Sequence, residues 1–223
     1  MLKTTASNPA RFGTLSKALI TYAILSEYVR HPLTFLVGTT LTLGRFKRAV
    51  PKDIPREFVD LFAYPAWIYI RLKERLPQEE AFALARAIIL PLGMAAYGAE
   101  FGLVEAPRTW TNFMAYLDRS LQQGAIQWSK VEREERSETV RRYRCTFCMI
   151  HEFLSRVGVP ELTEPFCSLD NALYNAYLPN EMTFDRGGPG NTIEKGNPFC
   201  QFNHELKLRG TPPDHRARLP ARG

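Results

Sequence analysis

The hydrophobic pattern of this chain changes near residue 128, and this change limits the fold more than any other feature. Before it, apolar residues recur at the spacing of a helix, most clearly after Pro107. The apolar positions there are Trp110, Phe113, Met114, Leu117 and Leu121. After residue 128 the elements become shorter and include alternating segments. The sequence therefore predicts an α+β fold, in which a helical N-terminal half packs with a small antiparallel sheet and two helices in the C-terminal half.

Three more helices are expected in the N-terminal half. Two cover residues 15–29 and residues 56–75, the latter with a break near Pro65. The third begins at Pro77. A proline is well suited to the start of a helix, because the backbone N–H that it lacks has no partner within the helix there. Residues 30–55 are rich in helix breakers and are expected to form short irregular pieces. These breakers are Pro32, Gly38, Gly44, Pro51 and Pro55.

The C-terminal half is expected to alternate between strands and helices. Every second residue of 137–147 shares one face of a predicted strand. These residues are Thr139, Arg141, Tyr143, Cys145 and Phe147. Helices should follow at 147–157, ended by Gly158, and at 164–178. Residues 181–208 contain three strand candidates, separated by the turn sequences GGPGN and KGNP.

The charge of the chain is concentrated at its end. The formal net charge is +6, but residues 207–223 contain five basic residues against one acid, so the rest is nearly neutral. This distribution argues against a nucleic-acid-binding protein. We expect a helical region at 1–127, an α+β region with the functional site at 128–208, and a disordered basic tail at 209–223.

The apolar segments fit neither a membrane span nor a secretion signal. Residues 32–44 are too short to cross a bilayer, and residues 87–104 contain Pro91 and Glu100. No small-residue cleavage site follows the apolar N-terminal segment. We therefore expect a cytoplasmic protein with reduced thiols and no integral membrane span. Weak association with a membrane surface and a homo-oligomer are left open.

All four cysteines, Cys145, Cys148, Cys167 and Cys200, lie in one stretch of the C-terminal half. Cys148 is expected in the first turn of a helix, with His151 three positions later on the same face. The helix dipole and a neighbouring imidazolium would both lower the pKa of Cys148, which suits a nucleophile with its base. The same residues also suit a zinc site, with four thiols or with His151 in place of one. Cys148 as an ordinary buried residue is a third alternative.

A series of motifs in the C-terminal half has a characteristic order. They are Cys148, ten residues before the glycine of GVPEL at 158–162; Cys167 with Asp170; FDR at 184–186; and TIEKGNPFCQF at 192–202. In this pattern the chain resembles the L-2-amino-thiazoline-4-carboxylic acid hydrolase family over roughly residues 140–206. The last motif also resembles the end of the 4-vinyl-reductase-like ligand-binding domain.

The resemblance implies a hydrolase without a cofactor that acts on a small cyclic amidine. The implied substrate is a molecule such as 2-aminothiazoline-4-carboxylate, which is opened to N-carbamoyl-cysteine. The candidate site residues are Cys148 as first and Cys167 as second choice of nucleophile, His151 as proton shuttle, Asp170 on the amidinium, Arg186 on the substrate carboxylate, Glu194 as a second substrate-binding residue, and Cys200. Two alternatives stay open: a zinc- or ligand-binding module without covalent catalysis, and a biosynthetic tailoring enzyme that uses the same pocket.

Overall fold

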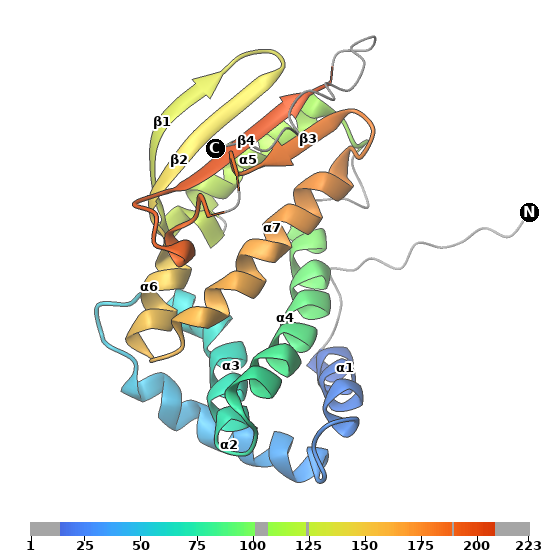
Figure 1. Cartoon of the computed structure of the whole chain (residues 1–223), viewed down its shortest axis with the longest axis vertical. Coiled ribbons are helices and arrows are strands. Elements are labelled where there is room, and N and C mark those ends of the chain that lie inside the picture. Colours follow the sequence, from blue (N-terminus) through green and yellow to red (C-terminus); the bar gives the residue numbers. More distant parts are fainter. Residues whose placement is uncertain (1–13, 101–106, 124, 189, 208–223) are drawn as a thin grey trace, which may run out of the picture.

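The computed structural model describes residues 14–100, 107–123, 125–188 and 190–207. Figure 1 shows a β-sheet at one end of the molecule and helices α1 and α2 at the other, with α3, α4 and α7 between them. The N-terminal half is helical and the C-terminal half combines an antiparallel sheet with helices. The predicted α+β fold class is therefore confirmed. The predicted tail at 209–223 lies outside the described residues.

Five helices are described in the N-terminal half. They are α1 (Thr14–Ser26), α2 (Pro32–Ala49), α3 (Arg56–Lys73), α4 (Gln78–Glu100) and α5 (Trp110–Gln123). α4 begins directly after Pro77, as expected. α3 runs through Pro65, where a break was expected. One face of α3 is closely packed, because Phe58, Ala66 and Leu72 are all buried, and this packing holds the helix together across the proline.

Helix α2 corrects the prediction of irregular pieces at residues 30–55. Pro32 occupies the first helical position, where no N–H is needed, and the helix ends at an extended Val50 before Pro51. The breakers thus lie mainly at the helix ends. Inside the helix, packing compensates for the glycines, because Phe35 is buried and the Phe46 ring stacks on Trp67 with 4.8 Å between ring centroids.

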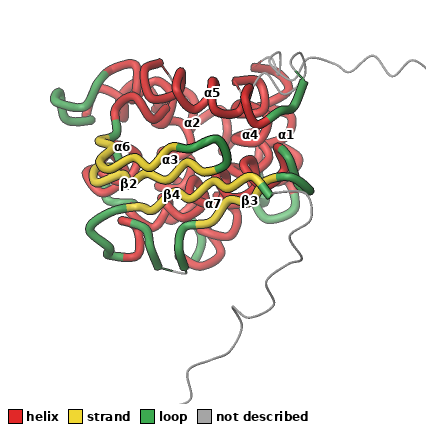
Figure 2. The backbone as a smooth tube through the Cα atoms, turned by 90° about the horizontal axis from the view of Figure 1, so that it is seen from above, coloured by secondary structure: helices red, strands yellow, loops and turns green. Residues whose placement is uncertain are grey.

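The sheet has four antiparallel strands in the order β1-β2-β4-β3, which lie side by side in Figure 2. The strands are β1 (Lys130–Arg136), β2 (Val140–Phe147), β3 (Met182–Asp185) and β4 (Cys200–Leu206). The sequence did not predict β1, because its residues KVEREER are mostly charged. Of the three strands predicted in 181–208, the middle one is wrong. Residues Ile193–Lys195 form a 3₁₀ turn that ends at Gly196, whose φ of 87° favours glycine.

The alternating face predicted for β2 is confirmed, because Arg141, Tyr143 and Cys145 are buried. Both predicted helices of this half are also present. They are α6 (Met149–Arg156) and α7 (Thr163–Tyr177). Gly158 follows α6 with a φ of 79°. Cys148 was expected in the first turn of this helix. It instead lies directly before α6, at the N-cap.

Helices α5 and α7 cover the same face of the sheet. Asp118 of α5 accepts a hydrogen bond from Arg141 Nη1 at 2.7 Å. The rings of Phe113 of α5 and Tyr174 of α7 lie 5.2 and 4.9 Å from the ring of His204 on β4. α7 also packs along α4, where Gly93 faces Leu169. The helical half thus supplies one wall of the space beneath the sheet. None of the described helices is long and apolar enough to cross a membrane.

Candidate active site

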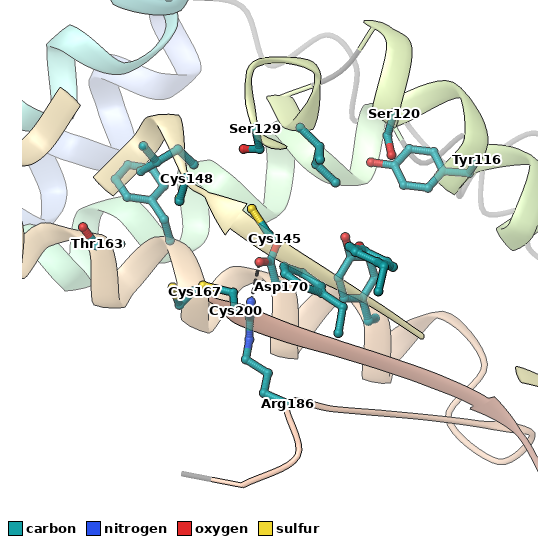
Figure 3. Close-up of a pocket in the computed structure, with 16 residues that line it drawn as sticks. Tyr116, Ser120, Ser129, Cys145, Cys148, Thr163, Cys167, Asp170, Arg186 and Cys200 are labelled. Carbon is teal, nitrogen blue, oxygen red and sulfur yellow. Dashed lines mark hydrogen bonds and ion pairs between the residues drawn. The ribbon is translucent and has the colours of Figure 1, made fainter. Parts of the chain in front are cut away.

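A cavity of about 70 Å³ lies beneath the sheet, and Figure 3 shows the side chains around it. The residues labelled there are Tyr116, Ser120, Ser129, Cys145, Cys148, Thr163, Cys167, Asp170, Arg186 and Cys200. They come from α5 and the segment after it, from β2 and β4, from α7, and from the end of β3. The cavity is therefore lined by parts of both predicted regions, 1–127 and 128–208.

The cavity brings together most of the residues singled out from the sequence. Cys148 enters it at the junction of β2 and α6. Cys167 and Asp170 are three positions apart on α7 and line it together. Cys200 begins β4 directly opposite Cys145 of β2, so these two thiols also meet at the cavity. The sulfur-rich stretch thus folds into one site.

Arg186 is the most unusual side chain in the cavity wall. Its exposed fraction is only 8%, and its guanidinium lies 4.3 Å from the centroid of the Phe202 ring. Nη2 donates a hydrogen bond of 2.6 Å to Oδ2 of Asp170. Within the described part of the chain, Nε and Nη1 are buried without a hydrogen-bond partner. Buried donors are normally paired, so these two N–H groups are available to a ligand.

Burial and charge act in opposite directions on Asp170. Burial raises its pKa, while the charge and the hydrogen bond of Arg186 lower it, and the net pKa is above the usual value. The pKa of Arg186 is also raised, because Asp170 outweighs the burial of the guanidinium. The Asp170 side chain keeps 28% of its surface accessible, against 7% for Arg186. The pair therefore places a partly accessible carboxyl group in the cavity wall.

The thiols of the cavity are protonated, which is opposite to the direction expected for Cys148. Burial raises the pKa of Cys148 to about 11, although the backbone N–H groups of Ile150 and His151 favour its anion. Burial also raises the pKa of Cys145 to about 12 and that of Cys200, and it raises that of Cys167 well above an ordinary value. The helix N-terminus acts on Cys148 as predicted, but desolvation is larger.

His151 does not line the cavity, in contrast to the role expected for its ring. Its Nδ1 lies 3.1 Å from Oγ1 of Thr163, which does line the cavity. The imidazole therefore stands behind Thr163. Only the backbone N–H of His151 is directed at the thiol of Cys148. His151 can position the cavity wall through Thr163.

Comparison with known protein families shows that residues 60–204 match the family described as L-2-amino-thiazoline-4-carboxylic acid hydrolase. The chain belongs to this family. Membership implies a hydrolase that acts on a thiazoline ring. The match begins within α3, so it includes the later part of the helical half, where the sequence motifs were not found, but not α1 or α2. A search of curated proteins and a search of solved structures each gave no match.

A second, open pocket of about 420 Å³ adjoins the cavity beneath the sheet. Cys167 and Arg186 line both spaces, so the pocket and the cavity meet at these two residues. Glu194, expected to bind substrate, lines the outer pocket and pairs with Lys195 at 2.9 Å. The structure therefore places Glu194 outside the inner cavity, in the wall of the adjoining outer pocket.

Tyr143 is a polar group of the cavity that sequence reasoning did not select. Its hydroxyl is buried and, among the residues described, finds no hydrogen-bond partner. Its ring stacks on Phe202 at 4.7 Å, and burial raises its pKa, so the phenol is neutral. The predicted face shared by Arg141, Tyr143 and Cys145 was the signal that could have revealed it. Thr163 was also not selected, and Cys145 was considered only as a zinc ligand.

The zinc alternative finds no ligand set in the described residues. No group of three or more His, Cys, Asp or Glu side chains among them is arranged to hold a metal ion. The four thiols surround a cavity and do not converge on one point. The same cavity wall also contains the Arg186–Asp170 ion pair, so the Asp170 carboxylate is already paired with a guanidinium.

Proposed function

We propose that this protein hydrolyses a small thiazoline that carries a carboxylate, such as 2-aminothiazoline-4-carboxylate, and that Cys148 is the nucleophile. The observation that carries the proposal is Arg186. Its guanidinium is more than nine-tenths buried, and Nε and Nη1, which have no partner among the described residues, call for hydrogen-bond acceptors from a ligand. The carboxylate of a heterocycle in the family's substrate class supplies two such acceptors in the planar geometry that a guanidinium matches.

The substrate is held by three groups of different chemistry. Arg186 donates from Nε and Nη1 to the substrate carboxylate. Asp170 faces the positive amidine portion. The neutral Tyr143 hydroxyl, also without a partner among the described residues, hydrogen-bonds a ring heteroatom. Because these groups are fixed by packing and by the Arg186–Asp170 pair, they orient the ring without reorganisation.

Cys148 becomes reactive only when the cavity is occupied. Its pKa of about 11 in the unliganded protein disfavours the thiolate, but the positive charge of a bound amidinium favours it. The proton passes to Asp170, and the N–H groups of Ile150 and His151 stabilise the sulfur anion. This coupling restricts the reactive thiolate to the substrate complex.

The reaction then proceeds in two stages. The Cys148 sulfur bonds to the ring carbon between nitrogen and sulfur. The ring carbon–sulfur bond breaks, and the ring sulfur takes the proton from Asp170. Water next adds to the same carbon and displaces the Cys148 sulfur, which recovers its proton. The product is a urea with a free thiol, and overall one water is consumed.

The test measures thiol released from 2-aminothiazoline-4-carboxylate by the purified full chain. Cys148→Ser should lower the rate by roughly 10³-fold or more. Arg186→Lys keeps the charge but loses the planar fork, so KM should rise roughly tenfold or more. Tyr143→Phe should cost roughly threefold to tenfold. Arg144→Lys is the matched control, because Arg144 projects from the opposite face of β2, where it bonds Gln201.

Each alternative has its own result. Full activity in Cys148→Ser with loss in Cys167→Ser would exchange the roles of these two cysteines. Activity that survives both substitutions but is lost in Asp170→Asn would indicate direct attack by water. If no thiol is released from any carboxylated thiazoline, the proposed function is wrong.

A further inference from the structure

The exposed large apolar side chains are concentrated at the end of the molecule opposite the sheet. Six of the seven found among the described residues lie on α1, on α2 or in the loop that joins them. They are Leu19, Tyr22, Tyr28, Leu33, Val37 and Leu41. Leu41 is 78% exposed and Leu33 is 65% exposed. Single exposed apolar residues are ordinary, but a group of this size on adjacent helices indicates a binding surface.

Helix α2 has apolar residues on two opposite sides. Phe35 and Thr39 are buried against the rest of the helical half. Leu33, Val37 and Leu41 recur every four residues on the exposed side. Together with Leu19 and Tyr22 of α1 and other residues, they line a groove of about 340 Å³ whose wall is almost entirely apolar. We call this surface the α1–α2 groove.

The segment that forms the groove carries more basic than acidic residues, although Lys47 is paired with Asp60 of α3. Residues 14–52 contain six Lys or Arg residues and a single acid, Glu27. Arg45 continues the row of Leu33, Val37 and Leu41 by one further step of four. The exposed side chains of Arg45 and Arg48 form no ion pair with any residue that the structure describes. An apolar surface bordered by cations is complementary to an anionic lipid surface, in which apolar acyl chains lie beneath negatively charged headgroups.

We propose that the α1–α2 groove binds the surface of membranes that contain anionic phospholipids. The leucines and the valine would enter the acyl boundary, while Arg45 and Arg48 would contact the headgroups. Tyr22 and Tyr28 suit this depth, because a phenol has an apolar body and a polar tip. Binding is interfacial, since no described helix is able to span the bilayer.

Charge argues against a second copy of this chain as the occupant. A symmetric dimer through the groove would bring together two copies of the same basic segment, each with Arg45 and Arg48 unpaired among the described residues. A membrane surface has no such conflict. Helices α1 and α2, which form the groove, also lie at the far end from the sheet in Figure 1, so membrane binding leaves the cavity beneath the sheet accessible. This inference does not depend on the proposed hydrolysis.

The test is co-sedimentation of the full chain with vesicles of phosphatidylcholine alone or with about one third phosphatidylserine. We expect binding to the anionic vesicles that weakens severalfold at high salt. The double variant Leu33→Asn/Leu41→Asn keeps the net charge and should lower the partition coefficient at least about tenfold. Leu61→Asn is the matched control, because Leu61 is 61% exposed on α3, does not line the groove and follows the acid Asp60.

Three results would overturn the proposal. The first is no sedimentation with either kind of vesicle. The second is equal loss of vesicle binding in Leu61→Asn and in the double variant, because the groove would then contribute no more to binding than an exposed leucine elsewhere. The third is a dimer in light scattering that dissociates in Leu33→Asn/Leu41→Asn, which would identify a second copy as the occupant. Circular dichroism and thermal unfolding of the double variant, measured in parallel, report on folding.

Discussion

The core of the helical half and the space beneath the sheet differ in what they bury. The helical core is built from apolar side chains such as Phe58, Ile68 and Leu72. The space beneath the sheet encloses two guanidinium groups, Arg141 and Arg186, and the imidazole of His204, all with exposed fractions of 8% or less. Removing charges from water is costly even when they are paired. The helical core therefore stabilises the fold. The buried polar groups beneath the sheet lower the free energy of unfolding, because they are kept away from water.

This difference explains where chemistry is possible. A polar group that already lies in a dry, fixed position interacts strongly with a ligand and needs no reorganisation. Arg186 and Tyr143 meet this condition, because each has polar atoms that are buried and, in the described residues, unpartnered. Four predictions test the contrast between the two interiors, in order of expected effect.

The largest effect concerns the ion pairs of the two regions. Asp170→Asn leaves the buried charge of Arg186 without its partner and should lower the free energy of unfolding by about 3 kcal/mol. Asp60→Asn breaks the exposed pair with Lys47 in the helical half and should cost less than about 1 kcal/mol. Denaturant unfolding of both variants measures this. Equal losses in the free energy of unfolding would show that the buried pair beneath the sheet and the exposed pair of the helical half do not differ in their contribution to stability.

The second prediction concerns the reactivity of Cys148 in the free protein. With a pKa of about 11, its thiolate at neutral pH is scarcer than that of an ordinary thiol by roughly two orders of magnitude, so iodoacetamide should modify it correspondingly slowly. Peptide mapping by mass spectrometry gives the rate. The reference is the same cysteine in denaturant. Faster alkylation in the folded protein than in denaturant would contradict the buried thiol.

The third prediction is an acid-dependent loss of stability caused by His204. Burial lowers its pKa from 6.5 to about 3. Between these values the unfolded chain binds a proton that the folded protein does not bind. The free energy of unfolding therefore falls as the pH falls, by about 1.4 kcal/mol per pH unit. Thermal unfolding of His204→Phe between pH 7 and pH 5 should lack this part of the slope.

The control for this measurement is His31→Phe, because His31 is exposed at the start of α2. The part of the slope that His204 causes should persist in that variant, because His204 is intact there. A slope unchanged in His204→Phe would mean that another group causes the loss at acid pH.

The fourth and smallest effect compares two glycines. A Cβ on Gly93 of α4 would collide with the buried Leu169 of α7, so Gly93→Ala should cost about 1–2 kcal/mol. Gly38 of α2 has open space around it, so Gly38→Ala should stabilise the protein by about 0.5–1 kcal/mol. Thermal denaturation distinguishes the two. A stabilising Gly93→Ala would show that α4 and α7 pack less closely than described.

The sequence by itself determined the elements whose signal is local. The stripe from Trp110 to Leu121 specified α5, and the alternation of Arg141, Tyr143 and Cys145 specified β2 and its buried face. It also indicated the residues of the site, because the spacing of Cys167 and Asp170 places both on one face of a helix. Local periodicity is sufficient for such inferences, since neighbours three or four positions apart on a helix, or two on a strand, share a face.

Only the tertiary structure decided the rest, because burial depends on residues that are distant in the chain. The helix at Pro32–Ala49 exists in spite of its glycines because it packs against α3. Arg186 pairs with Asp170, 16 positions away, when β3 is placed beside α7. The pKa of Cys148 rises because the fold removes it from water, and this outweighs the helix N-terminus that the sequence did reveal. Desolvation is set by the whole fold, and no local pattern encodes it.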